Sequence, residues 1–214
     1  MNQRLPLILV RHAQAEHHIR SITGGWSDTA LTNEGYKQSV LLAMRLAETL
    51  DGSQIHLGTS SLKRAIQTAE IIGEALRTPA FRYPPLSDIN NGEAAGKTHA
   101  EAQELVIPET DPLLDWQPYP QAESWREFFT RVVGFMDQFS AAQQSPAILV
   151  THAANVHVIV AWWLGLQVES RAQFEVAPAS LTVLRTNRFG EPAMDRLNDT
   201  AHLYVHCMPD PIRV

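Results

Sequence analysis

Two short, almost unbroken apolar runs place the strongest constraint on how this chain folds. Residues 5–10 read Leu-Pro-Leu-Ile-Leu-Val and residues 147–150 read Ala-Ile-Leu-Val, and both runs stop abruptly at polar residues. Runs of this length and composition are typical of strands that are buried on both faces of a parallel sheet. Such a sheet needs helices on both faces, so the two runs favour an α/β architecture.

Helical patterns and further short strands alternate with these runs. Helices are expected over residues 32–50, 61–76, 124–139 and 156–164, and additional strands over residues 55–57, 181–185 and 203–205. Thr32 is the expected cap of the first helix, in which five residues keep helical spacing: Tyr36, Val40, Ala43, Ala47 and Leu50. The alternation predicts a three-layer α/β/α sandwich with a mostly parallel central sheet.

Residues 84–120 break this alternation. The segment contains several prolines and the turn sequence Asn-Asn-Gly at residues 90–92, with only a short helical pattern near residues 98–105. We therefore expect a single domain over residues 1–214, in which residues 84–120 form an inserted segment of loop and short helix.

The charge balance and the cysteine count exclude several classes of protein. Lys and Arg number 17 against 23 Asp and Glu, a net charge of −6, which is the wrong sign for a generic binder of nucleic acid or of an anionic membrane. No apolar run approaches the roughly 18 residues that a membrane span requires, so we expect a cytoplasmic protein. Cys207 is the only cysteine, which excludes an intrachain disulfide and a cysteine-based zinc site, and we assign it no role.

Arginine and histidine follow the two apolar runs. Arg11 and His12 come directly after the first run, and His152 follows the second. Because ligands of open α/β sheets bind outside the carboxyl ends of the strands, we expect these side chains at one crevice. Arg64 lies in the first turn of the helix expected over residues 61–76, and its guanidinium can reach the same rim. One histidine at a strand end is more often structural than catalytic, but the joint placement favours a site.

Two arginines, two histidines and a helix N-terminus suit a dianionic phosphoryl group. The planar guanidinium matches phosphate oxygens, and a neutral imidazole nitrogen is a competent nucleophile toward phosphorus. Arg11, Arg64 and a protonated His152 would stabilise the charge on the equatorial oxygens in place of Mg²⁺. The pattern therefore predicts phosphoryl chemistry that needs neither a metal nor another cofactor.

Five blocks of sequence occur in a specific order. Residues 9–16 read Leu-Val-Arg-His-Ala-Gln-Ala-Glu, residues 24–28 Gly-Gly-Trp-Ser-Asp, and residues 31–35 Leu-Thr-Asn-Glu-Gly. Residues 60–69 read Ser-Ser-Leu-Lys-Arg-Ala-Ile-Gln-Thr-Ala, and residues 150–154 Val-Thr-His-Ala-Ala. Together the blocks resemble the histidine phosphatase superfamily, in its phosphoglycerate-mutase-like branch with an Arg-His-Gly signature, over residues 7 to about 166.

The resemblance implies roles for the matching residues. His12 would be the nucleophile that becomes phosphohistidine, and Gly24 and Gly25 would approach the substrate with their backbone. The phosphate pocket would be formed by Arg11, Arg64 and His152.

Three positions near the expected site differ from the family pattern. Ala13 and Ala153 stand where glycine is customary, so the backbone beside each histidine gains a Cβ and cannot comfortably adopt a positive φ; Ala153 stays among the expected substrate-binding residues. His18 replaces an asparagine that usually touches the phosphoryl group. Its imidazole would either donate the same hydrogen bond or be an ordinary exposed histidine.

The resemblance also implies a carboxylate proton donor in the loop after the third strand, and Asp88 occupies that place. It would protonate the leaving oxygen and then activate the hydrolytic water. Asp is one methylene shorter than the usual Glu, so the loop must come about 1.5 Å closer for the same geometry. Glu93 is the alternative acid. Ala94 and Ala95 replace a Trp-Glu pair of the family, which predicts a more open site.

Two other patterns are interpreted as structural. Residues 92–98 look like a phosphate-binding P-loop, but they have one residue too few between the glycines and follow a loop rather than a buried strand. His17 with His18, and His152 with His157, lack the spacing of a zinc site, so no metal site is expected.

The favoured function is a metal-independent phosphatase that acts on a small soluble phosphate ester, and a homodimer is the default assembly. A phosphoglycerate mutase is a second reading, but it must exclude water, and the chain length and open wall argue for hydrolysis. A catalytically impaired module that binds phosphate esters is the alternative from another class. The retained arginines and histidines weigh against that module, because binding alone does not require an in-line nucleophile.

Overall fold

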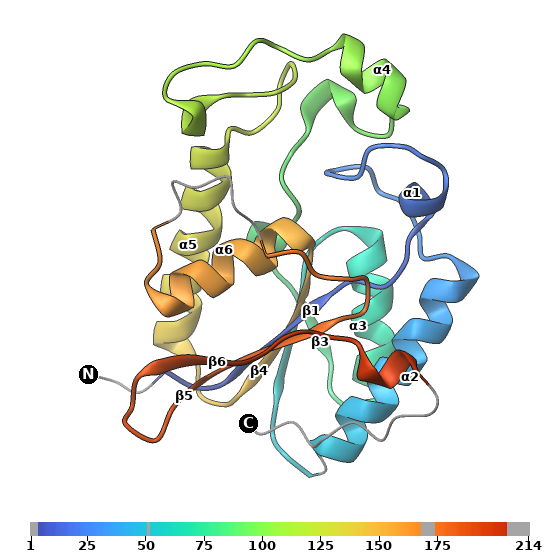
Figure 1. Ribbon diagram of the computed structural model, residues 1–214. Helices are drawn as coiled ribbons and strands as arrows, with labels where there is room; N and C mark the ends of the chain where they lie inside the picture. The colour runs from blue at the N-terminus through green and yellow to red at the C-terminus, as the bar shows by residue number, and fades with distance from the viewer. Residues whose placement is uncertain (1–3, 51, 168–173, 205–214) are drawn as a thin grey trace.

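One six-stranded sheet forms the centre of the protein (Figure 1). The computed structural model describes residues 4–50, 52–167 and 174–204. The strand order is β3-β2-β4-β1-β5-β6, where β1 to β4 are mutually parallel and β5 and β6 are antiparallel to their neighbours. The strands are β1 (Leu7–Arg11), β2 (His56–Thr59), β3 (Ala80–Arg82), β4 (Ala147–Thr151), β5 (Leu181–Thr186) and β6 (Pro192–Asp199).

Helices cover both faces of the sheet. α2 and α3 pack on one face and α5 and α6 on the other, as Figure 1 shows. The α-helices are α1 (Glu16–Ile19), α2 (Asn33–Thr49), α3 (Lys63–Leu76), α4 (His99–Glu104), α5 (Trp125–Ala142) and α6 (Ala153–Leu164). The expected α/β/α sandwich with a mostly parallel sheet is confirmed.

The two apolar runs supply both cores because successive strand residues point to opposite faces. In β1, Leu7 and Leu9 pack with α5 and α6, whereas Ile8 and Val10 pack with α2 and α3. All four side chains are fully buried, and β4 repeats the same alternation. A continuous apolar run, rather than an alternating one, is therefore what this position in the sheet requires.

The buried face of α2 differs in part from the expected one, since Ala43 and Leu50 are each only 3% exposed. Thr32 caps the helix as expected, since its hydroxyl accepts from the backbone N–H of Gly35. Tyr36 and Val40, however, are 42% and 48% exposed. Gly35 lies so close to residue 14 that a Cβ would come within 2.0 Å of a backbone oxygen, and this contact selects the stripe of the helix that faces the sheet. That stripe contains Gly35, Ser39, Leu42 and Leu46.

The expected strand over residues 203–205 is wrong. Leu203 ends a single 3₁₀ turn, Ala201–Leu203, and residue 205 lies outside the described residues, as does Cys207. The edge strand is β6 instead, which pairs with β5 through an irregular register. No residue of β6 is fully buried, so this edge strand contains polar residues and has no apolar run that would predict it. Among the other elements, β3 and α1 were not anticipated, and α6 begins three residues earlier than expected.

The expected insertion contains short helices and loops and no strand. It includes α4 and the 3₁₀ turns Pro84–Leu86, Gly92–Ala94 and Leu113–Asp115, and it leads into α5 at the upper end of the molecule in Figure 1. A bridge between Ile22 and Thr98 ties it to the loop after α1. Within the described part of the chain, no helix combines the length and apolar character needed to cross a bilayer.

Candidate active site

The parallel pairing of β1 and β4 brings His12 and His152 together. Arg11 and Thr151 are partners in the register, so the next residue of each chain leaves the sheet at the same edge. The backbone N–H of His12 donates to the carbonyl of Thr151 at 2.9 Å, and the two imidazole rings lie 5.0 Å apart. His12 is 2% exposed and its Nδ1 lies 2.8 Å from the carbonyl oxygen of Ala13. With its proton on Nδ1, the ring keeps a lone pair on Nε2.

Arg64, the second residue of α3, lies at the centre of this group. Its fully buried side chain donates from Nε to Nε2 of His12 at 3.1 Å. One terminal nitrogen also lies 3.2 Å from both Oδ2 of Asp88 and Nδ1 of His152. The remaining bonds run to the carbonyls of Ser27 and Gly25 at 2.7 and 2.8 Å. One guanidinium therefore contacts both histidines and the carboxylate.

His152 immediately precedes α6, and its ring is held from both sides. Oγ of Ser60 lies 2.8 Å from Nε2, while the guanidinium of Arg64 faces Nδ1. Ser60 follows β2, so this contact joins the ends of two neighbouring parallel strands. The sequence analysis did not single out Ser60, although its position directly after a buried strand was a usable signal.

Arg11 is held by the segment that leads into β5. Its NH1 donates to the carbonyl of Val176 at 2.5 Å, and its backbone carbonyl accepts from Ala179 at 3.0 Å. Its NH2 lies 2.9 Å from Nε2 of His18. The chain thus orients Arg11 through backbone groups nearly 170 residues away in sequence.

Asp88, rather than Glu93, lies beside these groups. Oδ2 of Asp88 is 3.2 Å from Arg64 and 3.8 Å from Nδ1 of His152, and the side chain is 18% exposed. Burial raises the pKa of Asp88, although Arg64, the N–H of Ile89 and Arg11 act in the opposite direction. Glu93 is exposed, and its Oε1 accepts from Gln121 at 3.0 Å.

The electrostatics of the site favour uncharged imidazoles. Burial, Arg64 and other nearby positive groups lower the pKa of His12 and of His152 well below their usual value. The expectation of a protonated His152 is therefore not met with the charges of the chain alone. A phosphoryl dianion adds the opposite charge, which favours the protonated ring.

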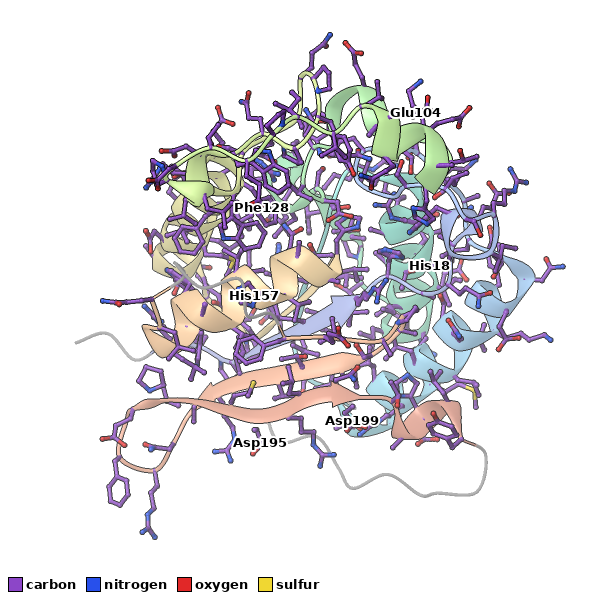
Figure 2. The ribbon with its side chains drawn as sticks, turned by 45° about the horizontal axis from the view of Figure 1, so that its top comes forward. His18, Glu104, Phe128, His157, Asp195 and Asp199 are labelled. Atoms are coloured by element: carbon purple, nitrogen blue, oxygen red, sulfur yellow. The ribbon has the colours of Figure 1, made fainter. Side chains whose placement is uncertain are left out.

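The residues that depart from the family pattern fit locally. Neither Ala13 nor Ala153 has a positive φ, so the added Cβ causes no backbone strain. The N–H of Ala15 donates to Nδ1 of His18 at 3.0 Å, and NH2 of Arg11 lies 2.9 Å from Nε2. His18 is half-buried and lies next to α3 in Figure 2, so it is not an ordinary exposed histidine.

Gly24 and Gly25 lie beside the site in different ways. A Cβ on Gly24 would come 3.2 Å from the His17 ring. Gly25 has a φ of +53°, and a Cβ there would lie 2.0 Å from Oδ1 of Asn91. Its carbonyl accepts from Arg64. The observed contact of Gly25 is thus with the arginine, and only glycine fits that turn.

Three histidines form the one group of at least three potential metal ligands among the described residues. His12, His17 and His18 each place a ring nitrogen within 4.8 Å of the others. Arg64 and Arg11, however, lie 3.1 and 2.9 Å from Nε2 of His12 and of His18. Two guanidinium groups beside the ligand atoms oppose a cation and favour an anion. His157 contacts Trp125 and Phe174 instead, away from His18 in Figure 2.

The expectation of a more open site at Ala94 and Ala95 is not met. Ala94 is fully buried and its carbonyl accepts from the hydroxyl of Thr23, while Ala95 is half-buried. The loop after α1 therefore closes the wall from which the larger side chains of the family are missing. His12, Arg64 and His152 are each at most 2% exposed.

Comparisons with known proteins show the family to which the chain belongs. The family model described as histidine phosphatase superfamily (branch 1) matches residues 7–200. Phosphoserine phosphatase 1 of Hydrogenobacter thermophilus is 28% identical over 205 residues, covering 92% of this chain and 93% of that protein. A probable phosphoglycerate mutase (GpmB) of Proteus mirabilis is 28% identical over 183 residues, 83% of each chain.

Solved structures share the fold. The α-ribazole phosphatase of Shigella flexneri superposes with a TM-score of 0.78 at 23% identity, over 92% of this chain and 97% of that one. A mycobacterial glucosyl-3-phosphoglycerate phosphatase gives a TM-score of 0.75 at 23% identity, over 91% and 99%.

Proposed function

Because the chain belongs to the histidine phosphatase superfamily, branch 1, we propose that it hydrolyses a small phosphomonoester through a phosphohistidine on His12. The observation that carries the proposal is the position of Arg64, whose guanidinium lies within 3.2 Å of His12, His152 and Asp88. On this proposal, His12 is the nucleophile, Arg11, Arg64 and His152 bind the phosphoryl group, and Asp88 transfers the proton.

In the first step, Nε2 of His12 attacks phosphorus. Nε2 carries a lone pair because Nδ1 donates to Ala13 and because the lowered pKa favours the uncharged ring, and the bond that Nε2 accepts from Arg64 must break before it attacks. A nitrogen–phosphorus bond forms as the bond to the leaving oxygen breaks, and Nδ1–H to carbonyl bonding stabilises the charge that develops on the ring. The product of this step is the phosphohistidine and an alcohol.

The charge on the phosphoryl oxygens would be stabilised by groups that the chain already orients. Arg11 and Arg64 provide guanidinium donors, and His152 becomes a cationic donor when the dianion raises its pKa. Nε2 of His18 and NH2 of Arg11 lie 2.9 Å apart, and a phosphoryl oxygen beside them would accept from the guanidinium. These groups supply the positive charge without a metal ion.

Asp88 would act as the acid and then as the base. Its raised pKa keeps a proton available for the leaving oxygen. In the second step the carboxylate takes a proton from water as the oxygen–phosphorus bond forms and the bond to His12 breaks, which releases inorganic phosphate and regenerates the acid.

Hydrolysis of p-nitrophenyl phosphate in the presence of EDTA tests the proposal. We expect turnover in EDTA, a phosphorylated protein that is stable to alkali and labile to acid, and loss of both in His12→Ala with phosphate binding retained. His99→Gln, an exposed histidine on α4, is the matched control and should behave as wild type. Tight phosphate binding without turnover would instead identify the catalytically impaired module.

The choice of acid has its own test. Asp88→Asn should slow leaving-group departure most for poor leaving groups such as alkyl phosphates, and Glu93→Gln should not. The reverse pattern would transfer the role to Glu93. Glu93 stands outside the group around Arg64, so we assign the proton transfer to Asp88.

A phosphoglycerate mutase is the second candidate. The 2% exposure of His12 and the similarity to the Proteus mirabilis protein favour it, because a mutase must keep water from its phosphohistidine. The lifetime of the phosphohistidine distinguishes the two functions: rapid loss to water supports the phosphatase, whereas loss only to an added phosphoglycerate supports the mutase. A screen of phosphorylated metabolites with phosphate release as the readout would identify the leaving alcohol.

A further inference from the structure

An ion pair outside the group around Arg64 holds the loop that carries Asp88. The guanidinium of Arg131, on α5, donates to the carbonyls of Pro85 and Ser87 at 2.7 and 3.1 Å and to that of Asp88 at 3.2 Å. Its remaining donors bind both carboxylate oxygens of Glu123 at 2.7 and 2.8 Å. All three contacts with the loop are to backbone oxygens, so the arginine holds the path of the chain itself.

Glu123 holds the other side of the same loop. Its Oε2 accepts from the N–H of Asn90 at 3.2 Å, and its own N–H donates to the carbonyl of Asn90 at 2.8 Å. The pair therefore binds residues on both sides of Asp88. Trp26 adds one more bond, from Nε1 to the carbonyl of Asp88 at 2.7 Å.

The pair is shielded from solvent. The side chain of Arg131 is 22% exposed and that of Glu123 is 13% exposed. A bidentate guanidinium–carboxylate pair has a defined geometry, and its partial burial protects it from screening by salt. It is thus suited to hold a backbone in place, in contrast to a flexible surface ion pair.

The length of the acid explains why the loop needs such support. An aspartate reaches about 1.5 Å less far than a glutamate, since it has one carbon–carbon bond fewer in its side chain. The backbone at Asp88 must therefore lie close to the phosphoryl site and stay there. A displacement of about 1 Å is enough to cost catalysis a factor of about 100.

We propose that Arg131 and Glu123 are positioning residues that set the reach of the Asp88 carboxyl toward the leaving oxygen. The inference rests on the proposed function. Both residues would act mainly through the backbone of the loop, and Arg131 is in addition one of the charges that lower the pKa of His152.

Arg131→Met tests the inference by its dependence on the leaving group. Hydrolysis of an alkyl phosphate, which needs the acid, should fall by about 100-fold, whereas hydrolysis of p-nitrophenyl phosphate should fall by less than about tenfold. Glu123→Gln should shift both rates in the same direction. Arg126→Met is the matched control, because Arg126 lies on the same helix as Arg131. It removes an exposed ion pair with Asp115 and should leave both rates unchanged.

Replacement of Asp88 by glutamate gives a second test, because its effect on the alkyl phosphate rate would not depend on Arg131 if Arg131 had a purely structural role. Asp88→Glu is measured alone and together with Arg131→Met. With Arg131 present, the longer side chain of Asp88→Glu should extend past the leaving oxygen. In Arg131→Met the loop is no longer held, so the longer side chain should restore the contact, and Asp88→Glu should affect the alkyl phosphate rate more favourably there. Equal effects of Asp88→Glu in both backgrounds would overturn the inference, because independent sites contribute additively.

Arg131→Lys guards against loss of folding. It keeps the charge but not the bidentate geometry, so its alkyl phosphate rate should lie between those of wild type and Arg131→Met, with a wild-type melting temperature. If wild type turns over through His12 and Arg131→Lys matches it on both substrates, the inference alone fails. If wild type shows no turnover that depends on His12, the proposed function fails first.

Discussion

Nε of Arg64 lies 3.1 Å from Nε2 of His12, so a buried guanidinium donates to the very nitrogen expected to attack phosphorus. The same guanidinium donates to the carbonyls of Gly25 and Ser27, which hold it between the two imidazoles. Burial and, after it, this cation lower the pKa of His12, and the guanidinium indicates where the phosphoryl oxygens would bind. It also makes the site depend on the loop after α1.

Arg64→Lys should abolish most of the activity although it preserves the charge. Lysine cannot reach His12, the carbonyl of Gly25 and Asp88 at once, because it lacks the planar fork of donors. We expect kcat to fall by about 100-fold to 1,000-fold, as for removal of an oxyanion donor. Steady-state kinetics measure the loss of kcat, and vanadate binding measures the loss of affinity for the phosphoryl group. Lys63→Met, the exposed neighbour on α3, should change neither, and an active Arg64→Lys protein would contradict the central role of the guanidinium.

The raised pKa of Asp88 predicts a pH dependence. The acid must be protonated to serve the leaving oxygen, so the rate with an alkyl phosphate should decline as the pH rises through the folded-state pKa. Asp88→Asn should remove this alkaline limb, and p-nitrophenyl phosphate should show less of it. If the alkaline decline of the pH–rate profile persists in Asp88→Asn, the titration belongs to another group.

The same shift affects stability. Since the folded state binds the Asp88 proton more tightly than the unfolded state, the free energy of unfolding should fall as the pH rises between the two pKa values. Urea unfolding of wild type and Asp88→Asn across this range measures the difference, and parallel curves would argue against a raised pKa.

Gly25→Ala should disturb the site through the backbone. The left-handed conformation costs an alanine roughly 1–2 kcal/mol. The new Cβ would also lie 2.0 Å from Oδ1 of Asn91, so the loop must move and displace the carbonyl that holds Arg64. Gly190→Ala has a similar φ, +81°, with nothing within 4 Å of the Cβ, and should incur only the conformational cost. Denaturation and kcat separate the two effects, and unchanged turnover in Gly25→Ala would show that the loop can adapt.

Arg45→Met should destabilise the fold without altering the catalytic group directly. Arg45 is 4% exposed and donates to Oδ2 of Asp199 at 2.6 Å and to His202 at 3.2 Å. Loss of a buried partner costs about 3 kcal/mol, whereas Arg126→Met at the exposed pair with Asp115 should cost under about 1 kcal/mol. Urea unfolding at pH 7 compares them, and equal losses would show that Arg45 is not needed to balance Asp199.

The Asp199 pair also predicts acid sensitivity. Burial alone would raise the pKa of Asp199, but the bonds from Arg45, the N–H of Ala201 and Arg196 lower it overall. A depressed folded-state pKa contributes stability above the unfolded-state pKa, which is lost as the pH falls toward the folded value. Asp199→Asn should therefore flatten the acid side of the stability curve.

The strand ends illustrate what could be read from the chain alone. The apolar runs at residues 5–10 and 147–150 each end one residue before the end of β1 and of β4. The polar residues that follow them, Arg11, His12 and His152, could therefore be predicted from the sequence. The face of α2 shows the limit. Its sequence contains two plausible apolar stripes, and a contact between Gly35 and residue 14 selects one of them.

By itself, the sequence determined the α/β sandwich and the cluster of arginine and histidine at its edge, because strand burial and strand termination are local properties of a few consecutive residues. Only the tertiary structure decided which carboxylate lies beside Arg64, which stripe of α2 is buried, and that Arg131 and Glu123 hold the loop of Asp88. These features depend on contacts between residues 21 to 43 positions apart in the chain, whose side chains carry no periodic signal that would connect them in advance.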